Sequence, residues 1–107
     1  MTLYLLNSSI IPNEGIYMYR KIPVETAREI IKSAGEIVSA IGHEPTAKYI
    51  SKLIGIEISV NRIQITMDKG DIALIFKIPV RLPELTVLNE KEIEKYGLEI
   101  GLLVRIL

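Results

Sequence analysis

The chain has 107 residues, enough for one domain with a modest core, and 49% of them are hydrophobic. Its 13 basic and 13 acidic side chains give a net charge of zero, so no overall positive field exists to attract long nucleic acid such as DNA. The absence of cysteine excludes disulfide bonds and thiolate metal sites, and the single histidine leaves a zinc site only if at least two carboxylates join it.

The predicted elements begin with two strands and a helix. Residues 3–6 form a short apolar run that ends at Asn7 and two serines, which favour turns because their side chains compete for nearby backbone groups. Residues 16–22 contain the β-branched and aromatic residues typical of a strand. Pro23 suits the start of a helix, and the apolar residues after it recur at helical spacing up to Gly35, which favours a stop.

A third strand, a second helix and a fourth strand are predicted next. Residues 36–41 form a short strand, which residues 42–46 interrupt. Apolar residues then recur on one face of a helix that Gly55 ends. Polar and apolar residues alternate over 62–67, as they do in a half-buried strand, and residues 68–70 favour a hairpin turn.

The last third of the chain is predicted to hold two strands around one helix. Residues 72–78 are almost wholly apolar, as in a central strand that is covered on both faces. Residues 79–87 form a loop. A capping box that opens with Asn89 predicts a helix over 90–96, which a glycine ends, and residues 99–106 form the final strand.

Together these elements predict a single compact domain over residues 1–107, of the α/β (α+β) class. We expect a mixed β-sheet of about five or six strands, with two to three helices packed on one face. The hydrophobic fraction is high for a soluble chain. Part of the apolar surface is therefore expected to be covered by a partner subunit.

The chain shows no sign of a targeting or membrane segment. Residues 1–7 lack a basic region, and their apolar run is too short for a signal peptide. No run of about 20 apolar residues is present, which a membrane-spanning helix would need. We expect a cytoplasmic protein with no membrane partner.

The strongest candidate for chemistry is His43, which follows Gly42 between a predicted strand and a predicted helix. Backbone N–H groups at a helix start are unsatisfied, and with the helix dipole they favour an anion. A histidine at this place can protonate an oxygen of a bound phosphate as a general acid. Taken alone, a single histidine at a helix start is more often a surface or capping residue.

Other polar groups are weaker candidates. Arg81 offers a planar fork for a phosphate, and Glu84 lies three residues later. Taken alone, such a pair is more often an exposed ion pair of little energy. Arg62 opens the predicted fourth strand. Asn7 and Ser8 follow the first strand, where they can contact a phosphate or base, or serve only as turn residues. No Walker-type phosphate loop and no nucleophile-elbow serine motif is present.

Taken in order, these groups resemble the motifs of a known family. The motifs are an early Asn after the first strand, an Ile-Gly-His-acid segment before a helix, an Asn-Arg pair and an Arg-Leu-x-Glu loop. Their counterparts are Asn7, Ile41-Gly42-His43-Glu44, Asn61-Arg62 and Arg81-Leu82-Pro83-Glu84. The chain resembles the viral ring nucleases, which are anti-CRISPR proteins of archaeal viruses and phages, with relatives in cellular genomes.

The resemblance implies an enzyme that needs no metal and no cofactor. The family binds cyclic tetra-adenylate between the subunits of a homodimer and cleaves it, which silences type III CRISPR signalling. It implies His43 as the general acid and Glu84 as a residue that assists catalysis. The residues that it implies for ligand binding are Asn7, Ser8, Gly42, Thr46, Arg62 and Arg81, with no metal ligand. If the source is a virus, the expected compartment is the host cytoplasm.

Two other functions remain open from the sequence. One is a dimer of the same fold that binds and sequesters the cyclic nucleotide without cutting it. The other is a structural or regulatory dimer with no nucleotide ligand. The presence of both His43 and Glu84 favours the enzyme.

Overall fold

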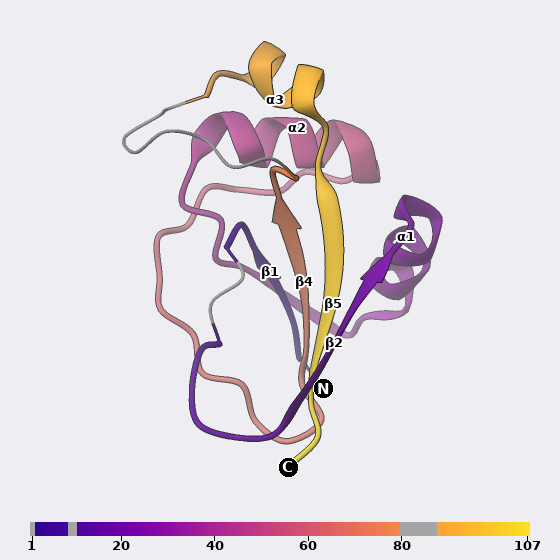
Figure 1. Cartoon of the computed structure of the whole chain (residues 1–107), viewed down its shortest axis with the longest axis vertical. Helices are drawn as coiled ribbons and strands as arrows, with labels where there is room; N and C mark the ends of the chain where they lie inside the picture. Colours follow the sequence, from indigo (N-terminus) through magenta and orange to yellow (C-terminus); the bar gives the residue numbers. More distant parts are fainter. Residues whose placement is uncertain (1, 9–10, 80–87) are drawn as a thin grey trace.

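The computed structural model describes residues 2–8, 11–79 and 88–107, in which the chain forms one mixed sheet and three helices (Figure 1). This agrees with the predicted fold class. In chain order the elements are β1 (Thr2–Leu6), β2 (Tyr17–Ile22), α1 (Val24–Ser33), β3 (Glu36–Ser39), α2 (Glu44–Ile54), β4 (Ile72–Lys77), α3 (Glu90–Tyr96) and β5 (Glu99–Arg105).

The five strands lie in the order β2-β5-β4-β1-β3. Strand β1 pairs in parallel with both β3 and β4, and β5 pairs antiparallel with β4 and β2. The carboxyl ends of β1, β3 and β4 therefore meet at one edge of the sheet, the upper edge in Figure 1. This edge is where the segments that carry the candidate residues leave the sheet.

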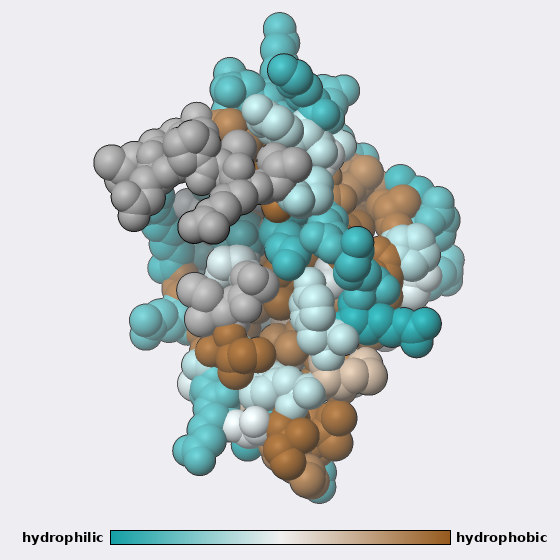
Figure 2. Space-filling view, viewed as in Figure 1, coloured by the Kyte–Doolittle hydropathy of each residue, from teal (hydrophilic) through white to brown (hydrophobic). Residues whose placement is uncertain are grey.

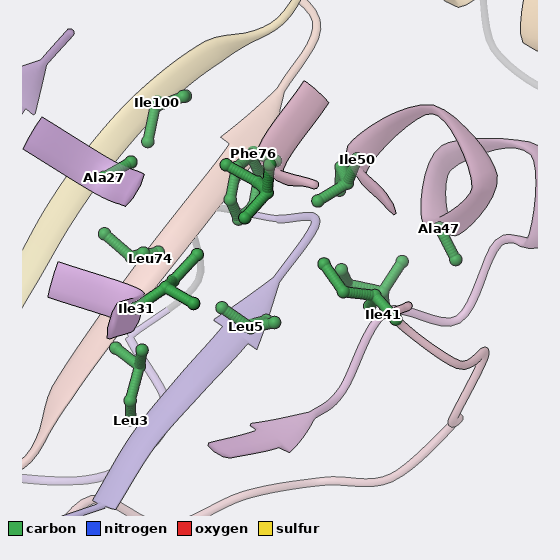
Figure 3. Close-up of a cluster of buried hydrophobic side chains, with 12 residues drawn as sticks. Leu3, Leu5, Ala27, Ile31, Ile41, Ala47, Ile50, Leu74, Phe76 and Ile100 are labelled. Atoms are coloured by element: carbon green, nitrogen blue, oxygen red, sulfur yellow. The ribbon is translucent and has the colours of Figure 1, made fainter. Parts of the chain in front are cut away.

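The core lies on both faces of the central strand β4. Leu74 and Phe76 are fully buried on one face, where helices α1 and α2 cover the sheet (Figure 3). Ala73 and Ile75 are buried on the other face. The prediction of a central strand covered on both faces is confirmed.

The predicted strand over 62–67, with its hairpin to the next strand, is wrong. No strand forms there, and the segment lies across the second face of the sheet, where Ile65 and Met67 pack against the buried residues of β4. Both edges of β4 are already occupied, by β1 and by β5, so no ladder position is left for a hairpin partner. The alternation in sequence reflects a segment with one side against the sheet face, and only the turn at residues 69–70 is confirmed.

The helix ends follow local chemistry. Gly55 ends α2 in the left-handed region, with φ of 88°, as predicted. Asn89 accepts from the backbone N–H of Glu92, whose side chain accepts in return, so the predicted capping box is confirmed. Helix α1 ends earlier than predicted, because Ala34 is already extended before Gly35 is reached.

Large apolar side chains are exposed at several places on the molecule. Figure 2 shows some of them in brown, with a group at the lower end of that face. None of the helices in the described ranges is long and apolar enough to cross a membrane. The exposed set is Ile11, Ile16, Met18, Tyr19, Ile37, Ile56, Val60, Ile63, Tyr96, Ile106 and Leu107.

Candidate functional site

The candidate site lies at the edge of the sheet where β1, β3 and β4 end. Asn7 and Ser8 directly follow β1, and the segment from Ala40 to His43 links β3 to α2. In open sheets with parallel strands, ligands bind outside the carboxyl ends of the strands, where the chain leaves in different directions. Candidate residues that are far apart in the sequence are therefore brought to the same end of the sheet.

His43 is the N-cap residue of α2, with an extended backbone (φ −125°, ψ 115°). Its ring does not cap the helix. Instead, Nδ1 lies 2.7 Å from the hydroxyl oxygen Oγ1 of Thr46, one turn into the helix. The ring is half-buried and Thr46 is buried. Because Nδ1 makes the contact with Thr46, the second ring nitrogen, Nε2, takes no part in it.

Helix α2 is a firm support for this pair. Its buried face packs into the main core through Ala47, Ile50 and Ile54, and its far end is closed by Gly55. Pro45 in the first turn lacks a backbone N–H, so the helix start offers one donor fewer to an anion. An anion bound at this helix start would therefore depend more on a nearby side-chain donor than it would at a helix start without proline.

Arg62 supplies such a group. Its Nε donates to the carbonyl oxygen of Gly42 at 2.8 Å, which places the exposed guanidinium beside the residue that precedes His43. A Cβ on Gly42 would lie 2.9 Å from Cγ of Arg62, closer than side-chain contacts tolerate. Glycine at this position therefore permits the close approach of the arginine to the helix start.

The segment that carries Arg62 is fixed to the end of β3. The backbone N–H of Asn61 donates to Ile41 O at 2.9 Å, and its side-chain Nδ2 donates to Ser39 O at 2.8 Å. The hydroxyl of Ser39 donates to Ser59 O at 2.7 Å. Asn61 and Ser39 thus hold Arg62 in place. The motif pointed to Asn61, whereas no pattern in the sequence separates Ser39 from an ordinary strand serine.

Beside this cluster is a cavity of about 540 Å³. Ser8 lines it, together with Ala40, Ile63 and Gln64 among others. Ile63 follows Arg62 directly and Ala40 lies two residues before Gly42, so the cavity adjoins the His43 cluster. Its lining mixes apolar side chains such as Ile63 with polar ones such as Ser8 and Gln64, and its volume is typical of small-molecule sites.

The predicted site residues are brought together in part. His43, Gly42, Thr46 and Arg62 form one connected cluster, and Ser8 lines the adjoining cavity. Asn7 is half-buried at the end of β1. Arg81 and Glu84 lie outside the described residues. Within the described part of the chain, no three His, Asp or Glu side chains are grouped as metal ligands would be.

A family model for STIV B116-like proteins matches residues 3–100, which is nearly the whole chain. The chain belongs to the STIV B116-like family. This is the viral ring nuclease family that the motifs indicated, so the predicted family membership is confirmed.

Relatives in the STIV B116-like family come from viruses and from a bacterium. Uncharacterized protein 26 of Sulfolobus islandicus filamentous virus is 36% identical over 105 residues, covering 94% of this chain and 88% of the relative. Uncharacterized protein YddF of Bacillus subtilis is 33% identical over 107 residues, covering 99% of each chain. These names state no activity.

A solved structure carries the same fold. B116 of Sulfolobus turreted icosahedral virus matches with a TM-score of 0.74 and 28% sequence identity, covering 98% of this chain and 100% of that chain. A match of this extent means that this chain and B116 share the same overall fold.

Proposed function

We propose that the protein is a metal-independent ring nuclease that binds cyclic tetra-adenylate at a homodimer interface and cleaves it to linear di-adenylate with a 2′,3′-cyclic phosphate. This would shut off type III CRISPR signalling. The observation that carries the proposal is the cluster at the start of α2, where the single histidine of the chain lies beside the exposed guanidinium of Arg62. Phosphate binding and proton donation are thus available at one place.

The reaction needs few protein groups because RNA supplies its own nucleophile. A ribose 2′-hydroxyl oxygen attacks the adjacent phosphorus, and the proton of that hydroxyl passes to water. The bond between phosphorus and the 5′-oxygen breaks. The departing oxygen takes a proton from His43, which regains one from solvent. Positioning and one proton donor per subunit therefore account for the step.

Two-fold symmetry supports a dimer as the working unit. A ring of four identical nucleotides and a homodimer can share a two-fold axis, so that two His43 side chains face opposite phosphates. Exposed apolar residues lie along the segment that links α2 to β4. Ile56, Val60 and Ile63 are 40%, 42% and 45% exposed, and all three belong to the segment that carries Arg62. A second subunit that packs there would cover this surface and close the site.

The adjoining cavity is the place we propose for an adenine base of the ring. A nucleobase attached to a phosphate beside Arg62 would lie within reach of Ile63 and Gln64, because consecutive residues are only about 3.8 Å apart. The flat face of a purine suits an apolar wall, and a glutamine amide can both donate to and accept from adenine. Ser8 adds a hydroxyl to the same cavity.

This placement predicts the effect of a charge in the cavity. Ile63→Asp is expected to lower affinity for cyclic tetra-adenylate about tenfold or more, because a carboxylate within a few ångströms of phosphate repels it by about 1–4 kcal/mol. Isothermal titration measures the affinity. Met18→Asp is the matched control, since Met18 is 41% exposed and lies on β2, at the opposite edge of the sheet. Equal affinity in the two variants would remove the cavity from the site.

Arg62 is expected to bind the phosphate backbone directly. Arg62→Ala should weaken binding of the ring about 10–100-fold, since a hydrogen bond to a charged group contributes about 1.5–3 kcal/mol. Arg20→Ala removes the same charge from an exposed position on β2 and should leave affinity close to that of the wild type. If both variants lose the same small amount, only net charge matters and Arg62 makes no specific contact.

A cleavage and retention assay tests the function itself. Radiolabelled cyclic tetra-adenylate is incubated with the wild-type protein in EDTA, and both the products and the bound ring are measured. Cutting supports the ring nuclease. Retention without cutting would instead identify a dimer that sequesters the ring. If the ring is neither cut nor retained, cyclic tetra-adenylate is not a ligand of this protein. Cyclic hexa-adenylate in parallel establishes the ring size.

The relatives frame the biological role. The STIV B116-like family includes viral proteins and a bacterial one, so the same activity would serve immune evasion when encoded by a virus and control of the cell's own signal when encoded by a cell. In either case the proposed place of action is the cytoplasm, where the messenger is made.

A further inference from the structure

The contact between His43 and Thr46 defines the orientation of the imidazole. Nδ1 and Oγ1 are 2.7 Å apart, a short hydrogen bond, and Thr46 is only 8% exposed. The hydroxyl therefore has limited access to a ligand, and its oxygen is hydrogen-bonded to the ring. This differs from the direct ligand contact expected of Thr46 from the sequence.

We propose that Thr46 is a positioning residue, which binds Nδ1 of His43 and so leaves the proton on Nε2 as the one given to the departing 5′-oxygen. The inference rests on the proposed ring nuclease activity. In the acid form both ring nitrogens carry protons, and the Nδ1 proton is donated to Oγ1 of Thr46. After the transfer from Nε2, the neutral ring keeps its Nδ1 proton and the same hydrogen bond.

A hydroxyl suits this task because it remains a partner throughout the cycle. It accepts from Nδ1 both before and after the transfer, so the ring does not have to turn between the two states. It is also neutral. A carboxylate at this position would favour the charged ring and oppose release of the proton, since an opposite charge close by stabilises the charged form.

The position of Thr46 in the fold restricts where its hydroxyl can lie. Thr46 lies in the first turn of α2, and its neighbour Ala47 is 2% exposed in the main core. A threonine within a helix has only two preferred rotamers about its first torsion, and the observed one places Oγ1 2.7 Å from Nδ1 of His43. The orientation of His43 is thereby tied to the packing of α2 against the sheet.

Two variants of Thr46 separate the hydroxyl from the shape of the side chain. Thr46→Val keeps the β-branched outline and removes the hydroxyl, and Thr46→Ser keeps the hydroxyl. Thr46→Val is expected to lower kcat for ring cleavage about 10–100-fold, because loss of orientation at the reacting atom carries a cost of this size. Affinity for the ring should change little, and Thr46→Ser should stay close to the wild type in both quantities.

A spectroscopic measurement reads the orientation without any substrate. His43 is the only histidine, so nitrogen-15 NMR of the imidazole reports this one ring. At alkaline pH the wild type and Thr46→Ser are expected to carry the proton on Nδ1. Thr46→Val should shift the population toward the form with the proton on Nε2. Circular dichroism of each variant verifies that the fold is retained.

The outcomes distinguish this inference from the proposed function. A wild-type spectrum dominated by the Nε2 form would overturn the role of Thr46, even if Thr46→Val fails to fold. The same holds if Thr46→Val is folded and has the wild-type spectrum, or cuts the ring at the wild-type rate. If the wild type cuts no ring, the ring nuclease proposal fails, and the predicted tautomer shift in Thr46→Val would then still support orientation of the ring by Thr46.

Discussion

His43→Ala is expected to cut cyclic tetra-adenylate about 10²–10⁴-fold more slowly than the wild type, because a positioned proton donor contributes that range to a rate. Affinity for the ring should be nearly unchanged, since Arg62 and the adjoining cavity remain in place. Single-turnover cleavage with excess protein measures the rate, and isothermal titration measures the affinity.

A second variant tests whether a slow His43→Ala variant reflects a disturbed helix start instead of the loss of a proton donor. His43 is the N-cap of α2, and its ring makes no capping hydrogen bond, so loss of the ring should cost the helix little. His43→Asn introduces a residue that caps helices well and carries no proton donor for the 5′-oxygen of comparable acidity. It should be as slow as His43→Ala. If either variant cuts as fast as the wild type, His43 is not the general acid.

Phe76→Ala is expected to lower the free energy of unfolding by about 3–5 kcal/mol, the usual cost of removing a fully buried aromatic side chain. Phe76 is 0% exposed at the centre of the sheet, on the face that α1 and α2 cover. Such a loss is a large part of the total stability of about 5–15 kcal/mol that small proteins have. Urea denaturation followed by circular dichroism measures it.

The matched control for Phe76 is an exposed apolar residue in the same sheet. Ile37 on the edge strand β3 is 38% exposed, so Ile37→Ala should cost much less. A loss of less than about 1 kcal/mol in Phe76→Ala would contradict the assigned core.

The fold was predictable wherever local chemistry decides the structure. The almost wholly apolar run over 72–78, which follows a turn at a glycine, predicted a strand covered on both faces, and β4 has that position. The glycine after α2 and the reciprocal cap of Asn89 and Glu92 act within a few residues, so the sequence is enough to place them.

The order of strands was not predictable because it depends on pairings between distant segments. The alternating residues 62–67 have the pattern of a strand, yet β1 and β5 occupy both edges of β4. The burial of Ile65 and Met67 follows the predicted alternation, but against a sheet face instead of within a ladder. Alternation reports which side of a segment is buried and does not report what the segment pairs with.

In the candidate site, too, the features that depend on neighbouring residues were predictable, and the contacts between distant residues were not. The location of His43 at a helix start follows from adjacent residues, and the sequence was sufficient to predict it. The contact between Arg62 and Gly42 joins positions 20 residues apart. The hydrogen bond by which Asn61 fixes this segment to Ser39 is visible only in the structure. The motif resemblance indicated that these residues belong together, and the geometry supplies the physical reason.

The most direct test of the account is the chemical nature of the product. Wild-type protein and cyclic tetra-adenylate are combined in EDTA, and the product ends are identified by mass spectrometry. Attack by the ribose 2′-hydroxyl with proton donation from His43 predicts linear di-adenylate that carries a 2′,3′-cyclic phosphate and a free 5′-hydroxyl. A ring that stays intact, or products with a 5′-phosphate, would contradict it.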